Sequence, residues 1–264
     1  MAVVVIYDSG VGGLSIFQNV VARCPEHDYL FVSDSQEFPY GTKPEAELLA
    51  RVQAVVTRVD QDFRIDVLIM ACNTASTLVL PYLRDAHEFQ VIGVVPAIKP
   101  AAEQSYSRKI GLLATPATVA RPYTDGLIAE FASDCHVTKV GSSELVFLAE
   151  SKLFGCRIDV SRIGTILKPI ISDSEIDVLV LACTHFPLLK DEIRSQLKKH
   201  GRNLRLVDSG QAIANRLESL CQTLNQAPNK PPTRTVLMTE LSAEPAFIRH
   251  LERMGFSKLQ HLIV

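Results

Sequence analysis

The sequence predicts an α/β protein built from two similar α/β domains with mainly parallel sheets, related by a pseudo-twofold axis. Three observations predict this fold class. Short apolar runs alternate with amphipathic segments, one apolar run occurs twice, and two prolines interrupt the pattern between the copies. The functional site is expected in the cleft between the two domains.

The apolar runs are rich in Val, Ile and Leu and only a few residues long. Runs that are apolar on both faces are typical of parallel strands covered by helices. The predicted strands are residues 3–6, 29–32, 67–70, 91–95, 110–114, 178–181 and 204–207. The helices expected between them include residues 46–59, 81–88, 120–131 and 188–199.

One strand with its following turn occurs in two copies. Residues 65–72 read IDVLIMAC and residues 176–183 read IDVLVLAC, which are identical at six of eight positions. Two buried strands can resemble each other by chance, but a shared Asp at the start and a shared Cys at the end are not generic. A duplicated α/β unit is the simpler explanation.

The boundary between the two units is expected at Pro96–Pro100, where the pattern is broken. Residues 226–235 predict a surface loop, followed by a strand at 236–238, a helix at 243–254 and an apolar tail. We expect this last segment to pack back onto the first half. The first domain is therefore predicted as residues 1–96 plus 209–264, and the second as residues 97–208.

Composition limits the partners and the compartment. The formal net charge is −2, which does not favour a nucleic-acid or membrane partner. The amino-terminal apolar run ends at Asp8 and has no basic region before it, so it does not predict a signal peptide. Six cysteines without a CxxC pair predict free thiols and a cytoplasmic location. Four of them are interpreted as small structural hydrophobes: Cys24, Cys135, Cys156 and Cys221.

The polar residues that follow the apolar runs are the candidates for a site, because ligands bind at the carboxyl ends of parallel strands. Cys72 and Cys183 hold equivalent positions in the two copies of the repeat. If the copies face each other, the two thiols point at one another across the cleft. The candidates after the strands are Asp8, Ser9, Gly10, Cys72, Asn73, Thr74, Thr115, Cys183, Thr184 and His185.

Two identical groups on opposite walls of the cleft suit the inversion of a stereocentre, because the carbon atom loses a proton from one face and gains a proton on the other. A thiol has an ordinary pKa of about 8.5, so both of its protonation states are accessible. A helix is expected to begin after each cysteine, and its backbone N–H groups would favour the thiolate. Asp8 and His185 are candidate proton shuttles. These residues predict a cofactor-independent amino-acid racemase.

The loop at residues 9–13 (SGVGG) is rich in glycine and follows the first strand. It has neither the Gly-Lys-Ser/Thr of a phosphate loop nor the GxGxxG spacing of a dinucleotide site. Its backbone N–H groups are expected to suit a carboxylate instead.

A set of short motifs resembles the glutamate racemase family. They follow the family's order from residue 8 to about residue 210, and together they are highly specific although each alone is weak. The motifs are DSGVGGL (8–14), PYG (39–41), ACNTAS (71–76), GVVPA (93–97), CTHFPLL (183–189) and VDSG (207–210).

The resemblance implies a role for each matching residue. Cys72 and Cys183 are implied as the catalytic thiols, the first acting on the D-isomer and the second on the L-isomer. It further implies that Asp8 assists proton transfer, that His185 helps Cys183, and that Glu150 supports that side of the site. The implied substrate contacts are Asp8, Ser9, Tyr40, Gly41, Asn73, Thr74, Thr184 and His185, with Thr115 and Thr118 as weaker candidates.

The resemblance also implies the reaction and its surroundings. The substrate is glutamate, the reaction uses no pyridoxal phosphate, other cofactor or metal, and the D-glutamate formed feeds peptidoglycan synthesis. Family members are often dimers, which leaves a homodimer open.

Three alternatives remain open at this point. Aspartate racemase shares the two-cysteine design, and one methylene changes discrimination by only about 1–3 kcal/mol. A non-catalytic binding protein for a small anionic ligand could use the same cleft. A thiol–disulfide oxidoreductase is disfavoured because no CxxC is present.

Overall fold

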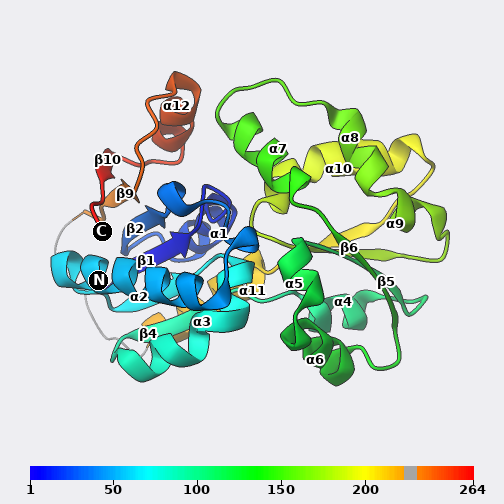
Figure 1. Cartoon of the computed structure of the whole chain (residues 1–264), viewed down its shortest axis with the longest axis horizontal. Coiled ribbons are helices and arrows are strands. Elements are labelled where there is room, and N and C mark those ends of the chain that lie inside the picture. The colour runs from blue at the N-terminus through cyan, green and yellow to red at the C-terminus, as the bar shows by residue number, and fades with distance from the viewer. Residues whose placement is uncertain (223–230) are drawn as a thin grey trace.

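Two parallel sheets lie side by side in the computed structural model, which describes residues 1–222 and 231–264 (Figure 1). The first sheet has six strands in the order β10-β9-β2-β1-β3-β4, and the second has four in the order β6-β5-β7-β8. Every strand pairing in both sheets is parallel. The predicted fold class is confirmed.

The strands are short and mostly buried, as expected for sheets covered on both faces. Those of the first sheet are β1 (Val3–Asp8), β2 (Asp28–Ser33), β3 (Val67–Met70), β4 (Gln90–Gly93), β9 (Arg234–Met238) and β10 (Lys258–His261). Those of the second are β5 (Lys109–Ala114), β6 (His136–Gly141), β7 (Val178–Ala182) and β8 (Arg205–Val207).

Helices connect the parallel strands and cover both sheets. The α-helices around the first sheet are α1 (Leu14–Arg23), α2 (Glu45–Phe63), α3 (Asn73–Ala86), α11 (Gly210–Cys221) and α12 (Pro245–Arg253). Those around the second are α4 (Ile98–Gln104), α5 (Pro116–Ala120), α6 (Pro122–Phe131), α7 (Glu144–Leu153), α8 (Val160–Ile166), α9 (Lys168–Ser172) and α10 (Lys190–Lys199). The loops that the structure describes contain three 3-10 helices: η1 (Ser35–Glu37), η2 (Tyr40–Thr42) and η3 (Phe186–Leu189).

Four apolar clusters form the core, one on each face of each sheet. On the first sheet, α1, α11 and α12 pack on one face and α2 and α3 on the other. On the second sheet, α7 to α10 cover one face, and α4 and α6 cover the other. Each unit therefore has three layers, with helices on both faces of its sheet. The ends of the strands remain as the place for polar side chains.

The strand order supports a duplication of one unit. The order β2-β1-β3-β4 in the first sheet corresponds to β6-β5-β7-β8 in the second. The repeated motif forms β3 and β7, which occupy the same position in their sheets. The aspartates of the motif also have similar roles: Asp66 accepts a hydrogen bond from the Val3 N–H at 2.7 Å, and Asp177 accepts one from the Tyr106 N–H at 2.7 Å.

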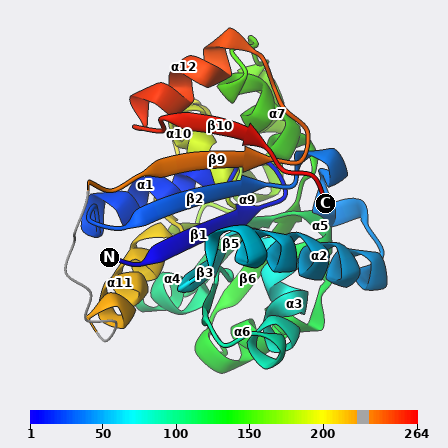
Figure 2. The same cartoon turned by 90° about the vertical axis from the view of Figure 1, so that its left-hand side faces the viewer.

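The carboxyl-terminal segment belongs to the first sheet. Figure 2 shows β10, β9, β2 and β1 side by side, and β9 pairs with β2 while β10 pairs with β9. The predicted strand and helix correspond to β9 and α12, and the apolar tail contains an additional strand, β10. Of the loop expected at 226–235, residues 226–230 lie outside the described residues, and residues 234 and 235 already belong to β9.

The chain crosses between the units twice, and the crossings touch. After β4 the chain passes to α4, which packs on the second sheet, and after β8 it returns to α11 on the first. The Ser209 hydroxyl of the second crossing donates to the Val95 carbonyl of the first at 2.7 Å. We propose 1–96 plus 209–264 and 97–208 as the two domains on this basis.

Several expected elements were wrong in their bounds or absent. The helix expected at 81–88 begins at Asn73, with Pro81 inside it, and the segment 120–131 contains the end of α5 and all of α6. The segment after Cys183 begins as the 3-10 helix η3 rather than as an α-helix. Strand β6 was missed because it is an edge strand with mostly exposed or half-exposed residues, so its sequence HVTKVG carries no apolar run.

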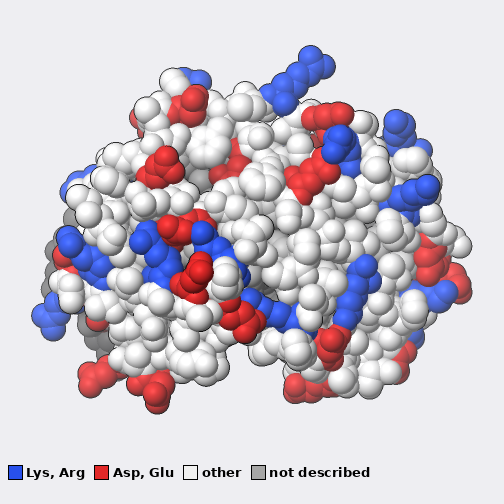
Figure 3. Space-filling model, in the orientation of Figure 1, with Lys and Arg blue, Asp and Glu red and all other residues white. Residues whose placement is uncertain are grey.

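Charges are spread over the molecule. In the space-filling view, acidic and basic side chains interleave over both units, and a notch separates the units at one edge (Figure 3). Within residues 1–222 and 231–264, no helix has the length and apolar character needed to cross a bilayer.

Candidate active site

A nearly closed cavity lies between the two sheets at their carboxyl ends. Its volume is about 20 Å³, enough for about one water molecule. It is lined by Ser9, Pro39, Tyr40, Gly41, Thr42, Cys72, Asn73, Thr74, Thr115, Ser143, Val146, Cys183, Thr184 and His185. A small organic molecule is larger than this volume, so the cavity must widen to admit one, as in enzymes that close around a substrate.

Cys72 follows β3 and precedes the first turn of α3. Its Sγ lies 3.7 Å from the Ser9 hydroxyl. Burial and the charge of Asp8 raise the pKa of the Cys72 thiol to about 12, although a backbone hydrogen bond from Ala75 acts in the opposite direction. The backbone N–H groups at the start of the helix favour the thiolate, as expected, but desolvation of the thiolate outweighs them at Cys72.

Cys183 follows β7 and belongs to a chain of three side chains. Its Sγ lies 3.8 Å from Nδ1 of His185, and Nε2 of the same ring lies 2.7 Å from Oε1 of Glu150. Burial lowers the pKa of His185, but its hydrogen bonds and charge interactions with Cys183 and Glu150 outweigh burial and raise that pKa well above its usual value. A positive ring at this place interacts favourably with negative charge on the Cys183 sulfur.

Asp8 ends β1 and is fully buried behind the cavity wall. It accepts hydrogen bonds from the Gly10 N–H at 2.9 Å and from the Thr184 hydroxyl at 2.8 Å. Burial raises the pKa of Asp8, while the charge of His185 and these two hydrogen bonds act in the opposite direction. The bond to Thr184 joins the first unit to the second at the site.

The glycine-rich loop allows the two units to approach closely. Its Val11 N–H donates to Oε1 of Glu150 at 2.8 Å, so the carboxylate that this loop holds belongs to the protein itself. A Cβ on Gly10 would lie 2.3 Å from the same Glu150 oxygen, and a Cβ on Gly12 would lie 2.4 Å from Nδ1 of His185. Glycine at these positions leaves the space that Glu150 and His185 occupy.

Tyr40 and Gly41 enter the cavity wall from η2. The Tyr40 hydroxyl donates to Oδ2 of Asp34 at 2.5 Å and is also hydrogen-bonded to the Tyr7 hydroxyl. Asp34 is fully buried, and Arg51 pairs with it at 2.7 Å. The Tyr40 hydroxyl donates its proton to Asp34, so this network anchors the loop that carries Tyr40. The tyrosine lines the cavity as part of its wall.

The predicted donors already have partners within the protein. The Asn73 side-chain amide donates to the Val94 carbonyl at 3.0 Å, and the Thr184 hydroxyl donates to Asp8. The Thr74 hydroxyl lies 3.1 Å from that of Thr115. These bonds hold the side chains in place, and each amide or hydroxyl keeps further hydrogen-bonding capacity for a ligand.

The cavity brings ten of the predicted residues together, Thr115 among them, and leaves Asp8, Gly10, Thr118 and Glu150 outside its lining. Asp8 and Glu150 do not line it and contact lining residues instead. Sequence reasoning missed four lining residues: Pro39, Thr42, Ser143 and Val146. Ser143 and Val146 follow β6, so recognising that strand would have identified them. Pro39 is part of the PYG motif, and Thr42 follows it directly.

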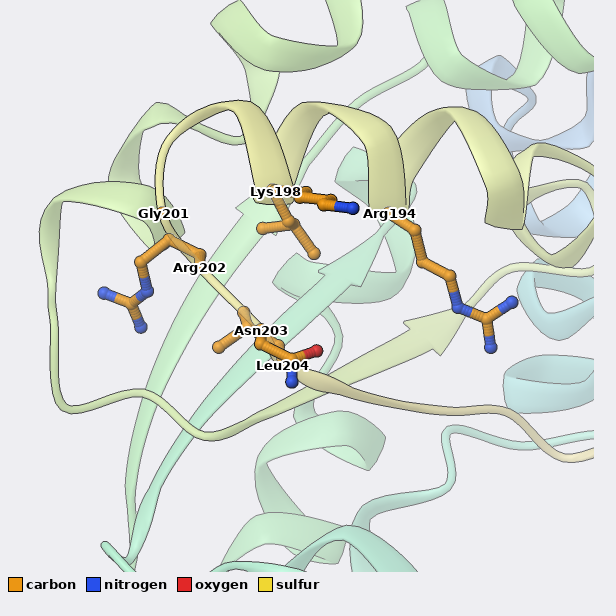
Figure 4. Close-up of a pocket in the computed structure, with 7 residues that line it drawn as sticks. Arg194, Lys198, Gly201, Arg202, Asn203 and Leu204 are labelled. Carbon is orange, nitrogen blue, oxygen red and sulfur yellow. The ribbon is translucent and has the colours of Figure 1, made fainter.

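Larger cavities lie elsewhere. One of about 570 Å³ is formed at the carboxyl-terminal end of α10 and the following turn, with Arg194, Lys198 and Arg202 at its edge (Figure 4). Arg202 donates to the carbonyls of Asp173 and Ile176, so it serves to hold the loop before β7. Neither cysteine of the repeat lines this cavity.

The acidic, histidine and cysteine side chains are the potential ligands of a metal ion. Within residues 1–222 and 231–264, no three of them form a group suited to a metal ion. Independence from metals and cofactors stays a prediction.

Fold and site together define a duplicated α/β protein with one thiol from each copy at a shared cleft. A family model for Asp/Glu/hydantoin racemases matches residues 12–217. The chain belongs to this family.

Close relatives extend over nearly the whole chain. The glutamate racemase of Vibrio vulnificus (strain YJ016) is 48 % identical over 257 residues, which cover 97 % of this chain and 95 % of the relative. The glutamate racemase of Shewanella sp. (strain MR-4) is 42 % identical over 265 residues, 98 % of this chain and 96 % of the relative.

Solved structures agree in fold. Escherichia coli glutamate racemase in complex with L-glutamate and the activator UDP-MurNAc-Ala superposes with a TM-score of 0.92 at 41 % identity, covering 100 % of this chain and 98 % of that chain. A glutamate racemase isoform of Bacillus anthracis gives 0.84 at 26 % identity, covering 100 % and 97 %.

Replacing Gly12 with Ala tests the close approach in the loop. The added methyl would displace His185, so we expect kcat to fall by about 10²-fold or more, the range of a lost general acid or base. The control is Gly126→Ala in α6, where a Cβ meets nothing within 4 Å and which should keep full activity. Steady-state racemisation assays measure both; wild-type activity in Gly12→Ala would contradict the role given to His185.

The raised pKa of Cys72 predicts how the free protein reacts with iodoacetamide. Iodoacetamide must reach the buried sulfur and reacts only with the thiolate, so alkylation of Cys72 should be slow at pH 8 and rise with pH toward its pKa of about 12. Exposed Cys156 serves as an accessible reference in the same sample. Peptide mass spectrometry follows both; a Cys72 rate that levels off below about pH 10 would contradict the direction of the shift.

Proposed function

We propose that this protein is a glutamate racemase that interconverts L- and D-glutamate by moving the Cα proton between two cysteines. The observation that carries the proposal is the pair of thiols, Cys72 and Cys183, that line one small cavity from the two copies of the repeat. Near-full-length relatives named glutamate racemase support the substrate, and L-glutamate is bound in the Escherichia coli enzyme.

The proposed reaction uses one thiolate and one thiol. In the L-to-D direction, the Cys183 thiolate removes the Cα proton and becomes a thiol, and the electron pair of the broken C–H bond stays on Cα and its carboxylate. The Cys72 thiol then delivers its proton to the opposite face and becomes a thiolate. The reverse direction exchanges the two roles. After each forward turnover Cys183 releases a proton to solvent and Cys72 takes one up, so the cycle consumes nothing else.

The electrostatics of the closed site suit the L-to-D direction. The raised pKa of Cys72 keeps this group a thiol, which is the form that must donate. The His185–Glu150 pair lies on the side of Cys183, where negative charge is needed first. In the D-to-L direction, Cys72 must act as the base. The positive charge of the substrate ammonium group near Asp8 would then offset the negative charge of Asp8 and so lower the pKa of Cys72.

The remaining residues would bind substrate and stabilise the carbanion. Asp8 and Ser9 are proposed to hold the ammonium region. Asn73 and Thr74 are proposed to donate to the carboxylates, and Thr184 to do so through its backbone N–H, because its hydroxyl donates to Asp8. Donors positioned before the reaction stabilise the negative charge that develops at Cα and its carboxylate. Tyr40 and Gly41 are proposed to contact the substrate from the neighbouring loop.

Other features follow from the family role. The D-glutamate formed would supply peptidoglycan synthesis, and the small-molecule substrate is the partner we propose. A cytoplasmic location and a homodimer remain predictions.

Turnover of two amino acids tests the function. Purified protein should abolish the circular dichroism of L-glutamate and of D-glutamate, and should act on L-aspartate at least about tenfold more slowly in kcat/KM. Faster turnover of aspartate would make the protein an aspartate racemase. Binding of glutamate without any change in ellipticity would make it a binding protein.

A further inference from the structure

Arg121 lies next to the cavity but belongs to none of the motifs. It stands between α5 and α6 in the second unit, and only 12 % of its side chain is exposed. The side chain reaches across to the first turn of α3 in the first unit. Arg121 therefore spans the cleft beside the site.

The contacts of Arg121 are mainly with the backbone and a hydroxyl of α3. Its Nη1 donates to the Thr74 carbonyl and, at 2.5 Å, to the Thr77 hydroxyl. Its Nε lies 3.5 Å from Oε1 of Glu45, a side chain that is 65 % exposed. An ion pair with so exposed a partner is weak. Glu45 therefore only partly offsets the positive charge of the guanidinium near the cavity.

Thr74 connects the guanidinium to the cavity. The Thr74 hydroxyl lies 3.1 Å from that of Thr115 and 3.4 Å from that of Thr118, and the last two are 2.9 Å apart. Thr74 and Thr115 line the cavity. The hydroxyls of Thr74 and Thr115 can turn their protons toward an anion in the cavity, and the positive charge of Arg121 at the Thr74 carbonyl favours an anion there.

The charges near the cavity are distributed unevenly. The acidic groups Asp8 and Glu150 contact Thr184, His185 and the glycine-rich loop. The buried Asp34 beneath Tyr40 is paired with Arg51. The largely buried Arg121 contacts Thr74 and Thr77 on the other side. A substrate with one ammonium group and a second carboxylate matches this distribution if its side-chain carboxylate lies toward Thr74 and Thr115.

We propose that Arg121 is a positioning residue that makes the site specific for a side-chain carboxylate over a neutral amide. The inference rests on the proposed function and deepens it. Arg121 acts through the first turn of α3, holding the Thr74 hydroxyl in place, and through its charge at the threonine cluster. A site without this cation would bind glutamate less tightly and would discriminate less against glutamine.

The test compares Arg121→Met and Arg121→Lys with the wild type. In Arg121→Met, the KM for L-glutamate should rise about tenfold to hundredfold, the range for a lost hydrogen bond to a charged group, with kcat within about threefold. The inhibition constant of L-glutamine should change by less than about threefold, because its side chain is neutral. Arg121→Lys retains the charge and should recover most of the affinity.

Glu45→Gln is the matched control. It removes the exposed partner of Arg121 and leaves the contacts with α3, so its KM should stay within about twofold of the wild type. If Arg121→Met does not fold, as judged by circular dichroism, Arg121→Gln takes its place.

Two results would overturn the inference. One is an unchanged glutamate KM in Arg121→Met, and the other is an equal loss of affinity for glutamate and glutamine, which would indicate a purely structural clamp. A wild-type protein that does not racemise glutamate would refute the proposed function instead. In that case calorimetric titration with DL-glutamate and DL-glutamine still compares the variants.

Discussion

The site depends on the docking of the glycine-rich loop of one unit against the second unit. The Thr184 hydroxyl donates to Asp8, the Val11 N–H donates to Glu150, and the Ser15 hydroxyl donates to the Thr184 carbonyl at 2.8 Å. These bonds are buried or partly buried and directional, so they hold the carboxyl ends of the two sheets in one orientation. Each sheet then presents its own cysteine to the same cavity.

The two cysteines are equivalent in the repeat but not in their surroundings. Cys72 is buried near the negative charge of Asp8, which opposes ionisation. Cys183 has a histidine as its neighbour, with a carboxylate behind it. Duplication accounts for the presence of two thiols, but the residues after them differ: His185 stands two positions after Cys183, and Thr74 stands two positions after Cys72. For reversible proton transfer, the two cysteines together must hold one proton. The difference in their surroundings decides which of the two sulfurs carries it.

Much of the fold was predictable because buried parallel strands carry continuous apolar runs, and the repeat at 65–72 and 176–183 indicated the duplication. Strand β6 could not be found in this way, since its exposed edge does not require apolar residues. At the site, motif residues were predictable from their place after a strand. Arg121 and Asp34 were not, because their importance lies in contacts with α3 and with Tyr40 that only the folded chain creates. The pKa of Cys72 likewise depends on burial, which the sequence does not reveal.

The central claim is that two different sulfurs serve the two faces of Cα, and deuterium incorporation during turnover in D2O tests it most directly. The L-glutamate that remains and the D-glutamate that forms are separated at about 10 % conversion and analysed by mass spectrometry. The account predicts deuterium at Cα of nearly all the D-glutamate, because the donating thiol has exchanged with solvent, and protium in the remaining L-glutamate. Retention of the original proton in the product would contradict it, since one group would then serve both faces.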